Sequence, residues 1–502
     1  RLFIVANRLP VTLTRAPPQM DRQTSEPGVQ SNAMMGIKGV NLMWIGWPGC
    51  VEFLIQAGSA VDEDERAGIA AKLIEKKCIP VFLTQKIADL YYDGFANTIL
   101  WCWVVLTSVR PLFHYIQPDI EVIQGADEQF SGYQAANKAF AKVVIQNYKE
   151  GDIIWIQDYH LFLLPSMVRA VLPTAKVCGA KQCCQIGFFL HIPFPSTEIM
   201  RTIPWREDLL NGSCVSLSSV GVLSSDLVGF HTPDFARHFR DSCQRILGLT
   251  VTTEVAEIQR LIVGGRYRRR ICSCWGAGID ADRFLQVLPT PAVQKHISEL
   301  LQKFSGKKLI LGIDRLDYTK GIPHKLYAME RFLEKNPDWV GKVVFVQIAV
   351  PSRTSVPEYQ RLTKKAHELV GRINGRFGSV AESCISFLDT SIPFDYMCAL
   401  YRVADSALIT SVRDGMNLVA FEYLACQSTQ PLGSSGVLIL SEFTGAAHCV
   451  GSGAIRVNPW DVNEVADAIR YSLTMSVEER VEHNNHARRY VQTHTAQHWA
   501  ET

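Results

Sequence analysis

Two cations in one short loop are the first residues whose types and spacing suggest chemistry. Arg315 and Lys320 lie between the apolar run Leu309–Ile313 and a Gly-Ile-Pro sequence that predicts the start of a helix. Because a helix start attracts anions, both cations could converge there on a phosphate. The loop alone leaves an alternative open, in which both cations are solvated and pair with Asp314 and Asp317.

A second loop, further along the chain, offers groups suited to a sugar nucleotide. The run Ala407–Ser411 predicts a strand, and the backbone N–H groups of residues 415–419 would face an anion at the start of the next helix. Asp414 precedes this helix start, and Glu422 follows about one turn into the helix. Glu422 could accept hydrogen bonds from ribose hydroxyls, as an acidic residue does in other nucleotide folds. The alternative is that both acids are helix caps or surface residues.

Other polar residues follow predicted strands, at the sheet edge where open α/β folds bind ligands. Arg8 follows the first apolar run, His191 follows Ile186–Leu190, and Arg353 follows Val343–Ala349. Arg8 could instead be a surface arginine. A lone histidine is more often a satisfied core residue, but the stiff proline-containing loop after His191 favours a site role.

Aromatic residues in the first half of the chain are candidates for sugar contacts. Residues 91–97 are predicted to form a polar aromatic loop that ends near Trp101, and Trp44 and Trp47 suggest packing beside a cleft. Tyrosine hydroxyls and tryptophan faces suit sugars or sugar phosphates, although the same rings could belong to the core.

Strand patterns that alternate with helical patterns predict two doubly wound α/β domains with a ligand cleft between their sheets. We expect a first domain at residues 1–285, a link at 282–306, a second domain at 306–477, and a helix at 478–502 that packs back on the first domain. Asp461 and Glu464 match a capping box that begins a helix. Further strands are expected at residues 2–6, 79–83, 152–157, 226–232 and 436–440, and further helices at 130–148 and 235–247.

The composition is that of a folded globular protein. The chain has 502 residues, of which 47% are hydrophobic and 20% charged, and its net charge of +2 predicts neither a nucleic-acid nor a membrane partner. The basic run Arg266–Arg270 is expected to be a solvated loop. The longest apolar run, at 98–113, is too short to span a membrane, and residues 2–6 are too short for a signal peptide. The fourteen cysteines lack zinc-site spacing, which favours reduced thiols in a cytoplasmic protein.

Several motifs, taken in order, resemble those of the trehalose-6-phosphate synthase family, most closely its plant type. The resemblance covers nearly the whole chain. It is carried by Asn7-Arg8-Leu9-Pro10, Trp44-Ile45-Gly46-Trp47, Asp158-Tyr159-His160, Phe188-Phe189-Leu190-His191, the segments Arg315–Gly321, Gly371–Gly375 and Arg413–Val419, and the plant-like segments Lys76–Leu83 and Thr493–Gln497.

The resemblance implies a GT-B glycosyltransferase, an α/β protein with two Rossmann-like doubly wound domains that face a central cleft. Such an enzyme moves glucose from UDP-glucose to glucose 6-phosphate with retention, which gives α,α-trehalose 6-phosphate and UDP. The resemblance implies no metal and no other cofactor, and it leaves open whether the chain forms a homo-oligomer. Retention without an obvious carboxylate nucleophile implies a front-face mechanism, in which the leaving phosphate takes the acceptor's proton.

The resemblance also implies roles for individual residues. Arg315 and Lys320 would neutralise the leaving diphosphate, which is the role that the loop itself suggests. Asp414 and His191 would hold hydroxyls of the donor sugar. The remaining contacts would be Leu418 and Val419 to the diphosphate, Glu422 to the ribose, Ile392 near the uracil, Arg8, Tyr92 and Arg353 to the acceptor's 6-phosphate, and Trp47, Trp101 and Asp158 around the acceptor.

The chain departs from the family's motifs mainly on the acceptor side. Val29 follows Gly28 where the family has a second glycine, and Gln157 stands where the family has histidine. Extra segments occur at residues 102–110, 178–185 and 212–220, as genuine insertions or as intron-derived sequence. Two other hypotheses therefore remain, a UDP-glucose transferase with another acceptor and a weakly active regulatory paralogue that binds sugar phosphates.

Overall fold

The computed structural model describes residues 1–13, 24–25, 37–49, 63–101, 125–172, 185–211, 221–251, 257–262, 266–274, 276–352, 357–380 and 382–501. The chain divides into two compact units, Arg1–Trp275 and Gly276–Thr502. Val29, Arg353 and almost all of the three extra segments lie outside the described residues. The second unit contains both the expected linking segment and residues 478–502. The expected packing of that last segment on the first domain stays a prediction.

The first unit is built on a mixed sheet whose order, within the described residues, is β5-β4-β1-β6-β7-β8-β11-β10-β9. The strands from β5 to β11 run parallel, and β9 and β10 are antiparallel additions at one edge. The strands are β1 (Leu2–Arg8), β4 (Leu42–Trp47), β5 (Cys78–Pro80), β6 (Ile153–Gln157), β7 (Gln185–Leu190), β8 (Leu227–Phe230), β9 (Thr250–Val251), β10 (Glu257–Ile262) and β11 (Arg266–Cys274), with a separate pair formed by β2 (Thr12–Leu13) and β3 (Thr24–Ser25).

Two expectations for the first unit are wrong. Residues 91–97 lie in a helix, Asp89–Leu100, rather than in a loop, because Phe95 packs on Phe130 and Tyr133 with ring centres 5.0 and 4.7 Å apart. The run Arg266–Arg270 lies in β11, where it pairs antiparallel with β10, rather than in a solvated loop. A Gly-Gly pair between two extended runs is a hairpin pattern that could have predicted this strand.

The helical segments of the first unit connect the parallel strands. They are α3 (Glu63–Glu75), α4 (Gln85–Ala88), η1 (Asp89–Leu100, with π-type hydrogen bonds), α7 (Ala126–Asn147), η3 (Tyr159–Leu161), α8 (Leu164–Val171), α10 (Thr197–Arg201), α11 (Arg206–Asn211), η4 (Val222–Ser224) and α12 (Pro233–Leu247). The expected helices at 130–148 and 235–247 are therefore confirmed as α7 and α12.

The second unit has a parallel sheet with the strand order β14-β13-β12-β15-β16-β17 among its described residues. Numbered within the unit, this order is 3-2-1-4-5-6, the Rossmann arrangement, which reverses direction between β12 and β15. Ligands bind at such a reversal, outside the carboxyl ends of the strands. The strands are β12 (Lys308–Arg315), β13 (Val343–Val350), β14 (Ile385–Leu388), β15 (Ser406–Ile409), β16 (Val437–Ser441) and β17 (Ile455–Val457).

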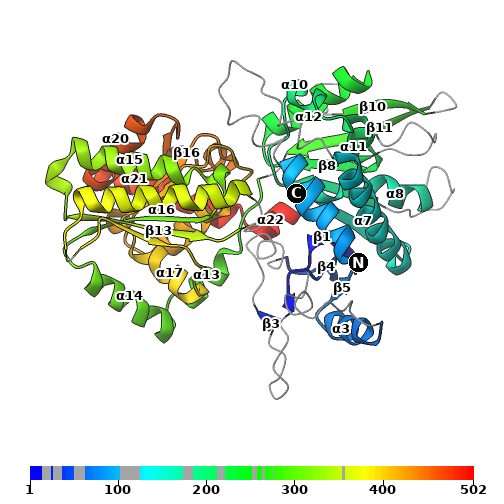
Figure 1. Cartoon of the computed structure of the whole chain (residues 1–502). Coiled ribbons are helices and arrows are strands. Elements are labelled where there is room, and N and C mark those ends of the chain that lie inside the picture. The colour runs from blue at the N-terminus through cyan, green and yellow to red at the C-terminus, as the bar shows by residue number, and fades with distance from the viewer. Residues whose placement is uncertain are drawn as a thin grey trace. The chain divides into compact units, whose positions relative to one another are not determined.

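Helices cover both faces of this sheet, as Figure 1 shows for α15 and α16 on one face and α14 and α17 on the other. Alternate residues of β12 bury in different cores, with Leu309 and Leu311 on one face and Ile310 on the other. The helical segments are α13 (Ala281–Val287), α14 (Pro291–Lys303), η5 (Tyr318–Lys320), α15 (Ile322–Lys335), η6 (Pro337–Trp339), α16 (Pro357–Phe377), α17 (Phe394–Val403), α18 (Leu418–Gln427), η7 (Leu432–Ser434), α19 (Gly445–Val450), η8 (Gly451–Gly453), α20 (Val462–Thr474), α21 (Val477–Thr493) and α22 (Ala496–Glu501).

The helix starts in the second unit follow from local side chains. Asp461 accepts hydrogen bonds from the amides of Asn463 and Glu464, which confirms the expected start of α20. The expected capping box is only half formed, because the Glu464 carboxylate accepts from the amide of Asn458 rather than from that of Asp461. Ser476 and Glu479 form a capping box at the start of α21.

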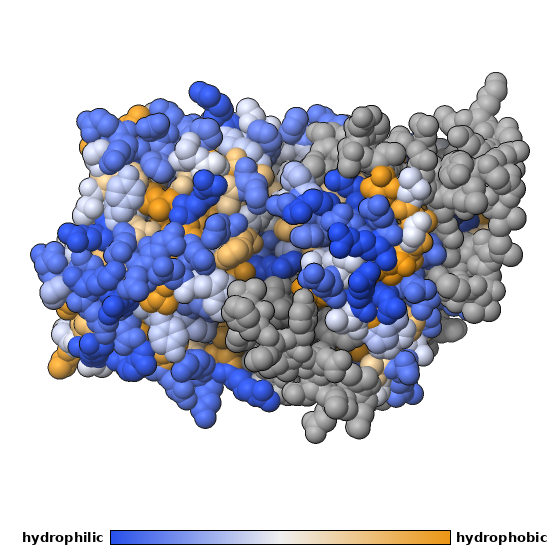
Figure 2. Space-filling view, turned by 90° about the horizontal axis from the view of Figure 1, so that it is seen from above, coloured by the Kyte–Doolittle hydropathy of each residue, from blue (hydrophilic) through white to orange (hydrophobic). Residues whose placement is uncertain are grey.

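The hydropathy of the surface can be followed on one face of the molecule (Figure 2). On the face seen in Figure 2, hydrophobic groups lie scattered among hydrophilic ones in the described part of the chain. Among the residues that the structure describes, none of the helices combines the length and the apolarity that crossing a membrane requires.

Candidate active site

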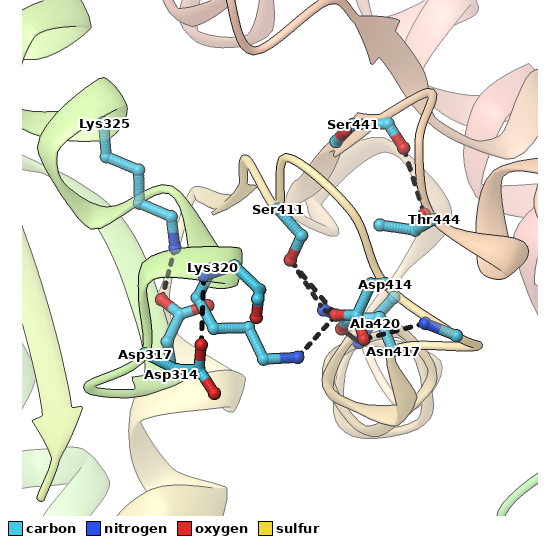
Figure 3. A network of polar contacts seen from close by, with 12 residues as sticks. Asp314, Asp317, Lys320, Lys325, Ser411, Asp414, Asn417, Ala420, Ser441 and Thr444 are labelled. Atoms are coloured by element: carbon cyan, nitrogen blue, oxygen red, sulfur yellow. Dashed lines mark hydrogen bonds and ion pairs between the residues drawn. The ribbon is translucent and has the colours of Figure 1, made fainter. Parts of the chain in front are cut away.

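The loops after β12 and β15 meet at the reversal of the second sheet. β12 and β15 are neighbouring parallel strands, so their carboxyl ends lie at the same edge. Lys320 comes from the first loop and Asp414 from the second, and Figure 3 shows both among a network of polar contacts. Arg315 is exposed and ends β12. The predicted anion-binding loop therefore lies at the position where open α/β sheets of this topology bind ligands.

Close packing holds the first loop against the second. The amide of Val412 donates to the carbonyl of Thr319 over 2.8 Å, and Gly321 has a φ of +64° at the start of α15. A Cβ at Gly321 would lie 2.1 Å from the carbonyl oxygen of Thr410. Glycine is therefore required both by the backbone angle and by this contact.

The carboxylate of Asp414 is the centre of the polar network. Its Oδ2 lies 2.5 Å from Nζ of Lys320, and it accepts hydrogen bonds from Nδ2 of Asn417 at 2.9 Å and Oγ of Ser411 at 3.1 Å. Burial works to raise the pKa of Asp414, but the charge and hydrogen bond of Lys320, the Asn417 amide and the charge of Arg315 together lower it below its usual value. Asp414 is therefore held ionised, in one orientation, beside Lys320.

The start of α18 lies directly after this network. Asn417 adopts a left-handed conformation with a φ of +62° and caps the helix, because its Oδ1 accepts from the amide of Ala420. Leu418 and Val419 form the first turn, where amides point out of the helix start and favour an anion. This geometry supports the diphosphate contact expected for these two residues.

A buried ion pair lies beneath the loop. The Lys325 side chain is 0% exposed and pairs with Asp314, whose Oδ2 also accepts from Nε2 of Gln347 at 3.0 Å. Burial lowers the pKa of Lys325 even though Asp314 opposes this shift. Sequence reasoning did not identify Lys325 or Gln347, although a lysine on the apolar face of α15 was a usable signal.

Glu422 is almost fully buried in α18, with 5% of its surface exposed. Its Oε2 accepts a hydrogen bond of 2.9 Å from the hydroxyl of Tyr401 on α17. Burial raises the pKa of Glu422 to about 7, although this hydrogen bond and the charge of Arg283 oppose the shift. Ile392 is half-buried ahead of α17 and packs against the core. The ribose and uracil contacts of Glu422 and Ile392 stay predictions.

The first unit gathers three of the residues expected to bind the acceptor. Arg8 ends β1, and its guanidinium carbon lies 4.4 Å from the ring centre of Trp47 and 5.3 Å from that of Tyr92. The Trp47 and Tyr92 rings are 5.8 Å apart, edge to face. His160, which sequence reasoning did not single out as a ligand, stacks on Tyr92 with the ring centres 5.8 Å apart. The rings of Trp47 and Tyr92 therefore hold the Arg8 guanidinium at the carboxyl end of β1.

Asp158 and His191 form a second group in the first unit, after β6 and β7. Asp158 has a φ of +67°, and its Oδ1 accepts from the backbone amide of His191 at 3.2 Å. The ring Nε2 of His191 lies 2.8 Å from Oε1 of Gln157. Trp101 is buried with its ring centre 5.7 Å from that of Tyr159. The strand order of the first sheet also reverses direction between β1 and β6. Asp158 follows β6, at this reversal, and His191 follows the neighbouring strand β7.

The structure thus places the predicted residues in two sets. Lys320 and Asp414 are in contact, with Arg315, Leu418, Val419, Glu422 and Ile392 in the same unit. Arg8, Trp47 and Tyr92 are in contact in the first unit, which also holds Trp101, Asp158 and His191.

Two Rossmann-like units, with cations and a helix start at the sheet reversal of the second, are the features of the GT-B fold. Solved relatives have this fold, and they include a trehalose-phosphate synthase from Burkholderia xenovorans in complex with glucose-6-phosphate. That structure has 28% sequence identity and a TM-score of 0.79, over 100% of this chain and 98% of the other. The model of glycosyltransferase family 20 matches residues 1–502, and the chain belongs to this family.

Two further comparisons agree with this family membership. The chain is 47% identical, over 506 residues, to an α,α-trehalose-phosphate synthase (UDP-forming) of Arabidopsis thaliana, and it spans 100% of its own length but 49% of that protein. The Escherichia coli trehalose-6-phosphate protein solved with UDP-2-fluoro glucose has 28% identity and a TM-score of 0.77, over 100% of this chain and 97% of the other.

Proposed function

We propose that the chain is a retaining glucosyltransferase that moves glucose from UDP-glucose to glucose 6-phosphate and forms α,α-trehalose 6-phosphate and UDP. The observation that carries the proposal is the contact between Lys320 and Asp414 at the reversal of the second sheet, directly before the start of α18. This site combines a cation for a diphosphate with a fixed carboxylate for sugar hydroxyls. The relative solved with UDP-2-fluoro glucose supports this donor.

On the donor side, each residue has a role that follows from its chemistry. Arg315 and Lys320 neutralise the diphosphate as the bond to glucose breaks, with the amides of Leu418 and Val419 as additional donors. Asp414 is an acceptor and holds sugar hydroxyls. Glu422 accepts hydrogen bonds from the ribose.

On the acceptor side, Arg8 and Tyr92 bind the 6-phosphate together with Arg353. The two aromatic rings beside the Arg8 guanidinium support this role, because they hold the planar cation in one place. Trp47, Trp101 and Asp158 contact the sugar. The relative solved with glucose-6-phosphate supports this acceptor.

The protein contributes to the reaction mainly by placing charged side chains around the leaving diphosphate and the sugar. The bond between the anomeric carbon and the UDP oxygen breaks, a bond from the same carbon to the acceptor's anomeric oxygen forms on the same face, and the acceptor's proton passes to the leaving phosphate. Hydrogen bonds from Ser411 and Asn417 hold the Asp414 carboxylate in one orientation, which suits it to accept hydrogen bonds from the sugar. Lys320 and Arg315 supply the positive charge that the leaving group needs, so we propose that no metal is required.

A reducing compartment such as the cytoplasm fits the cysteines that the structure describes. Cys78, Cys243, Cys384, Cys398, Cys426 and Cys449 are free thiols, and all except Cys449 are buried.

UDP release from UDP-glucose, measured with and without glucose 6-phosphate and with excess chelator, tests the function. We expect release that depends on glucose 6-phosphate and is unchanged by the chelator. Release that requires a different sugar would indicate another acceptor. Tight binding of both ligands without release would indicate a regulatory paralogue, and either result would overturn the proposal.

A further inference from the structure

A side-chain contact in the first unit involves the residue that departs from the family's motif. Gln157 ends β6, and its Oε1 lies 2.8 Å from Nε2 of His191, which follows the neighbouring parallel strand β7. Gln157, the residue that differs from the family's motif, therefore contacts the His191 ring, which is expected to bind the donor sugar.

A second hydrogen bond of the Gln157 amide determines which of its two terminal atoms, Oε1 or Nε2, faces His191. Nε2 of Gln157 lies 3.5 Å from the carbonyl oxygen of Trp155, to which it can donate. If the amide were flipped, Oε1 would face that carbonyl with no proton between them, which is repulsive. Oε1 therefore faces His191, and because a carbonyl oxygen only accepts, Nε2 of the histidine must carry a proton.

The surroundings of the ring keep it neutral. Burial, and secondarily the neighbouring His231 whose ring centre lies 5.2 Å away, lower the pKa of His191 well below its usual value. Asp158, the acid beside this histidine, accepts from its backbone amide. A neutral imidazole with a proton on Nε2 has none on Nδ1, which is then its hydrogen-bond acceptor.

We propose that Gln157 is a positioning residue that holds His191 in the Nε2-protonated form, so that the ring recognises a donor-sugar hydroxyl as an acceptor through Nδ1. The sugar contact rests on the proposed function, whereas the proton position does not. A histidine at 157, as in the family's motif, could donate or accept and would impose no single form. Gln157 therefore keeps His191 as a ligand of the sugar and restricts its ring to one protonated form.

The proton position can be measured in the whole chain without any substrate. Long-range ¹H–¹⁵N correlation spectra of ¹⁵N-histidine-labelled protein, assigned with His191→Gln, should show Nε2 protonated. Gln157→Leu, which has a similar volume without hydrogen bonds, should give a mixture of forms, and so should Gln157→His, which keeps a polar group if the leucine variant fails to fold. Gln146→Leu, at an exposed position on α7, is the matched control. A proton on Nδ1 in the unaltered protein, or an unchanged form in both Gln157 variants, would overturn the proposal.

Donor analogues test the consequence for the sugar. Each hydroxyl of the glucose is replaced in turn by hydrogen or by fluorine, which cannot donate a hydrogen bond, and the affinity is measured by calorimetry. At one position we expect both replacements to weaken binding equally, by roughly tenfold, and this loss to shrink in Gln157→Leu. A fluorinated donor that binds as well as UDP-glucose where the deoxy donor does not would show that the ring donates, and would overturn the proposal. If neither replacement nor His191→Gln affects affinity at any position, the proposed donor contact fails while the proton measurement stands by itself.

Discussion

Nζ of Lys320 lies 2.5 Å from Oδ2 of Asp414, although the two residues come from different loops. In the free protein each charge therefore neutralises the other. We infer that a diphosphate at the start of α18 would compete with Asp414 for the lysine, which would leave the carboxylate available to sugar hydroxyls. The two roles proposed for these residues are linked by this exchange of partners.

Lys320→Ala should lower kcat by about 100-fold to 1,000-fold, because a preorganised cation on the leaving group contributes mainly in the transition state. Steady-state UDP release measures the effect. The control is Lys335→Ala, whose side chain pairs with Asp467 on the surface and should keep full turnover. Undiminished kcat in a folded Lys320 variant would rule out its role with the diphosphate.

Asp414→Asn should have opposite effects on product binding and on turnover. Without the carboxylate, the charge of Lys320 is no longer neutralised, so UDP should bind severalfold to about tenfold more tightly in calorimetry. Turnover should fall because the sugar loses its anionic acceptor. Asp467→Asn, a surface acid, should change neither value. Weaker UDP binding in Asp414→Asn would contradict the exchange of partners.

The affinity for UDP-glucose should increase with pH and level off above about pH 7. Burial raises the pKa of Glu422 to about 7, and in the proposed ribose contact the ionised carboxylate is a stronger hydrogen-bond acceptor than the protonated acid. Protonation below this pH therefore weakens binding, by at most about tenfold per pH unit. Burial lowers the pKa of His191 well below its usual value, which reduces the contribution of this ring to the profile. Calorimetry between about pH 5.5 and 8.5 measures the profile.

Two variants check the assignment of that profile to Glu422. Glu422→Gln should remove the pH dependence. Tyr401→Phe should move the midpoint upward, because the lost hydrogen bond favours the ionised form. A profile that Glu422→Gln leaves unchanged would show that another group titrates.

Lys325→Met should destabilise the fold by about 3–5 kcal/mol, because it leaves Asp314 buried without its cation. Adding Asp314→Leu should recover part of this loss, since the unpaired charge is then removed. Urea unfolding followed by tryptophan fluorescence measures both variants. If the double variant loses more unfolding free energy than Lys325→Met, the ion pair itself, rather than the removal of an unpaired charge, would determine the stability.

Local sequence patterns predicted the sheet edges and the loops of the candidate site. Arg315, Lys320 and Asp414 follow short apolar runs that are strands, and a glycine or an asparagine begins the helix after each loop. Such runs are informative because parallel strands bury both faces.

Features that depend on distant neighbours could not be predicted in this way. The alternative interpretation of the first loop paired Asp314 with the loop cations, but Asp314 instead contacts Lys325, which is buried in the core. Residues 91–97 contain a glycine and polar residues typical of a turn, yet their aromatic residues pack on α7 as a helix. The contact between Gln157 and His191 depends on the register of β6 and β7, which no local pattern specifies.

The product formed from UDP-glucose labelled with ¹³C at the anomeric carbon, in the presence of glucose 6-phosphate, tests the central claim most directly. NMR spectroscopy should show the label in an α-anomeric carbon that is linked through oxygen to the α-anomeric carbon of the acceptor, with UDP formed in equal amount and no reducing end. Labelled free glucose, a β-linked product, or no product from protein that binds both substrates would contradict the account.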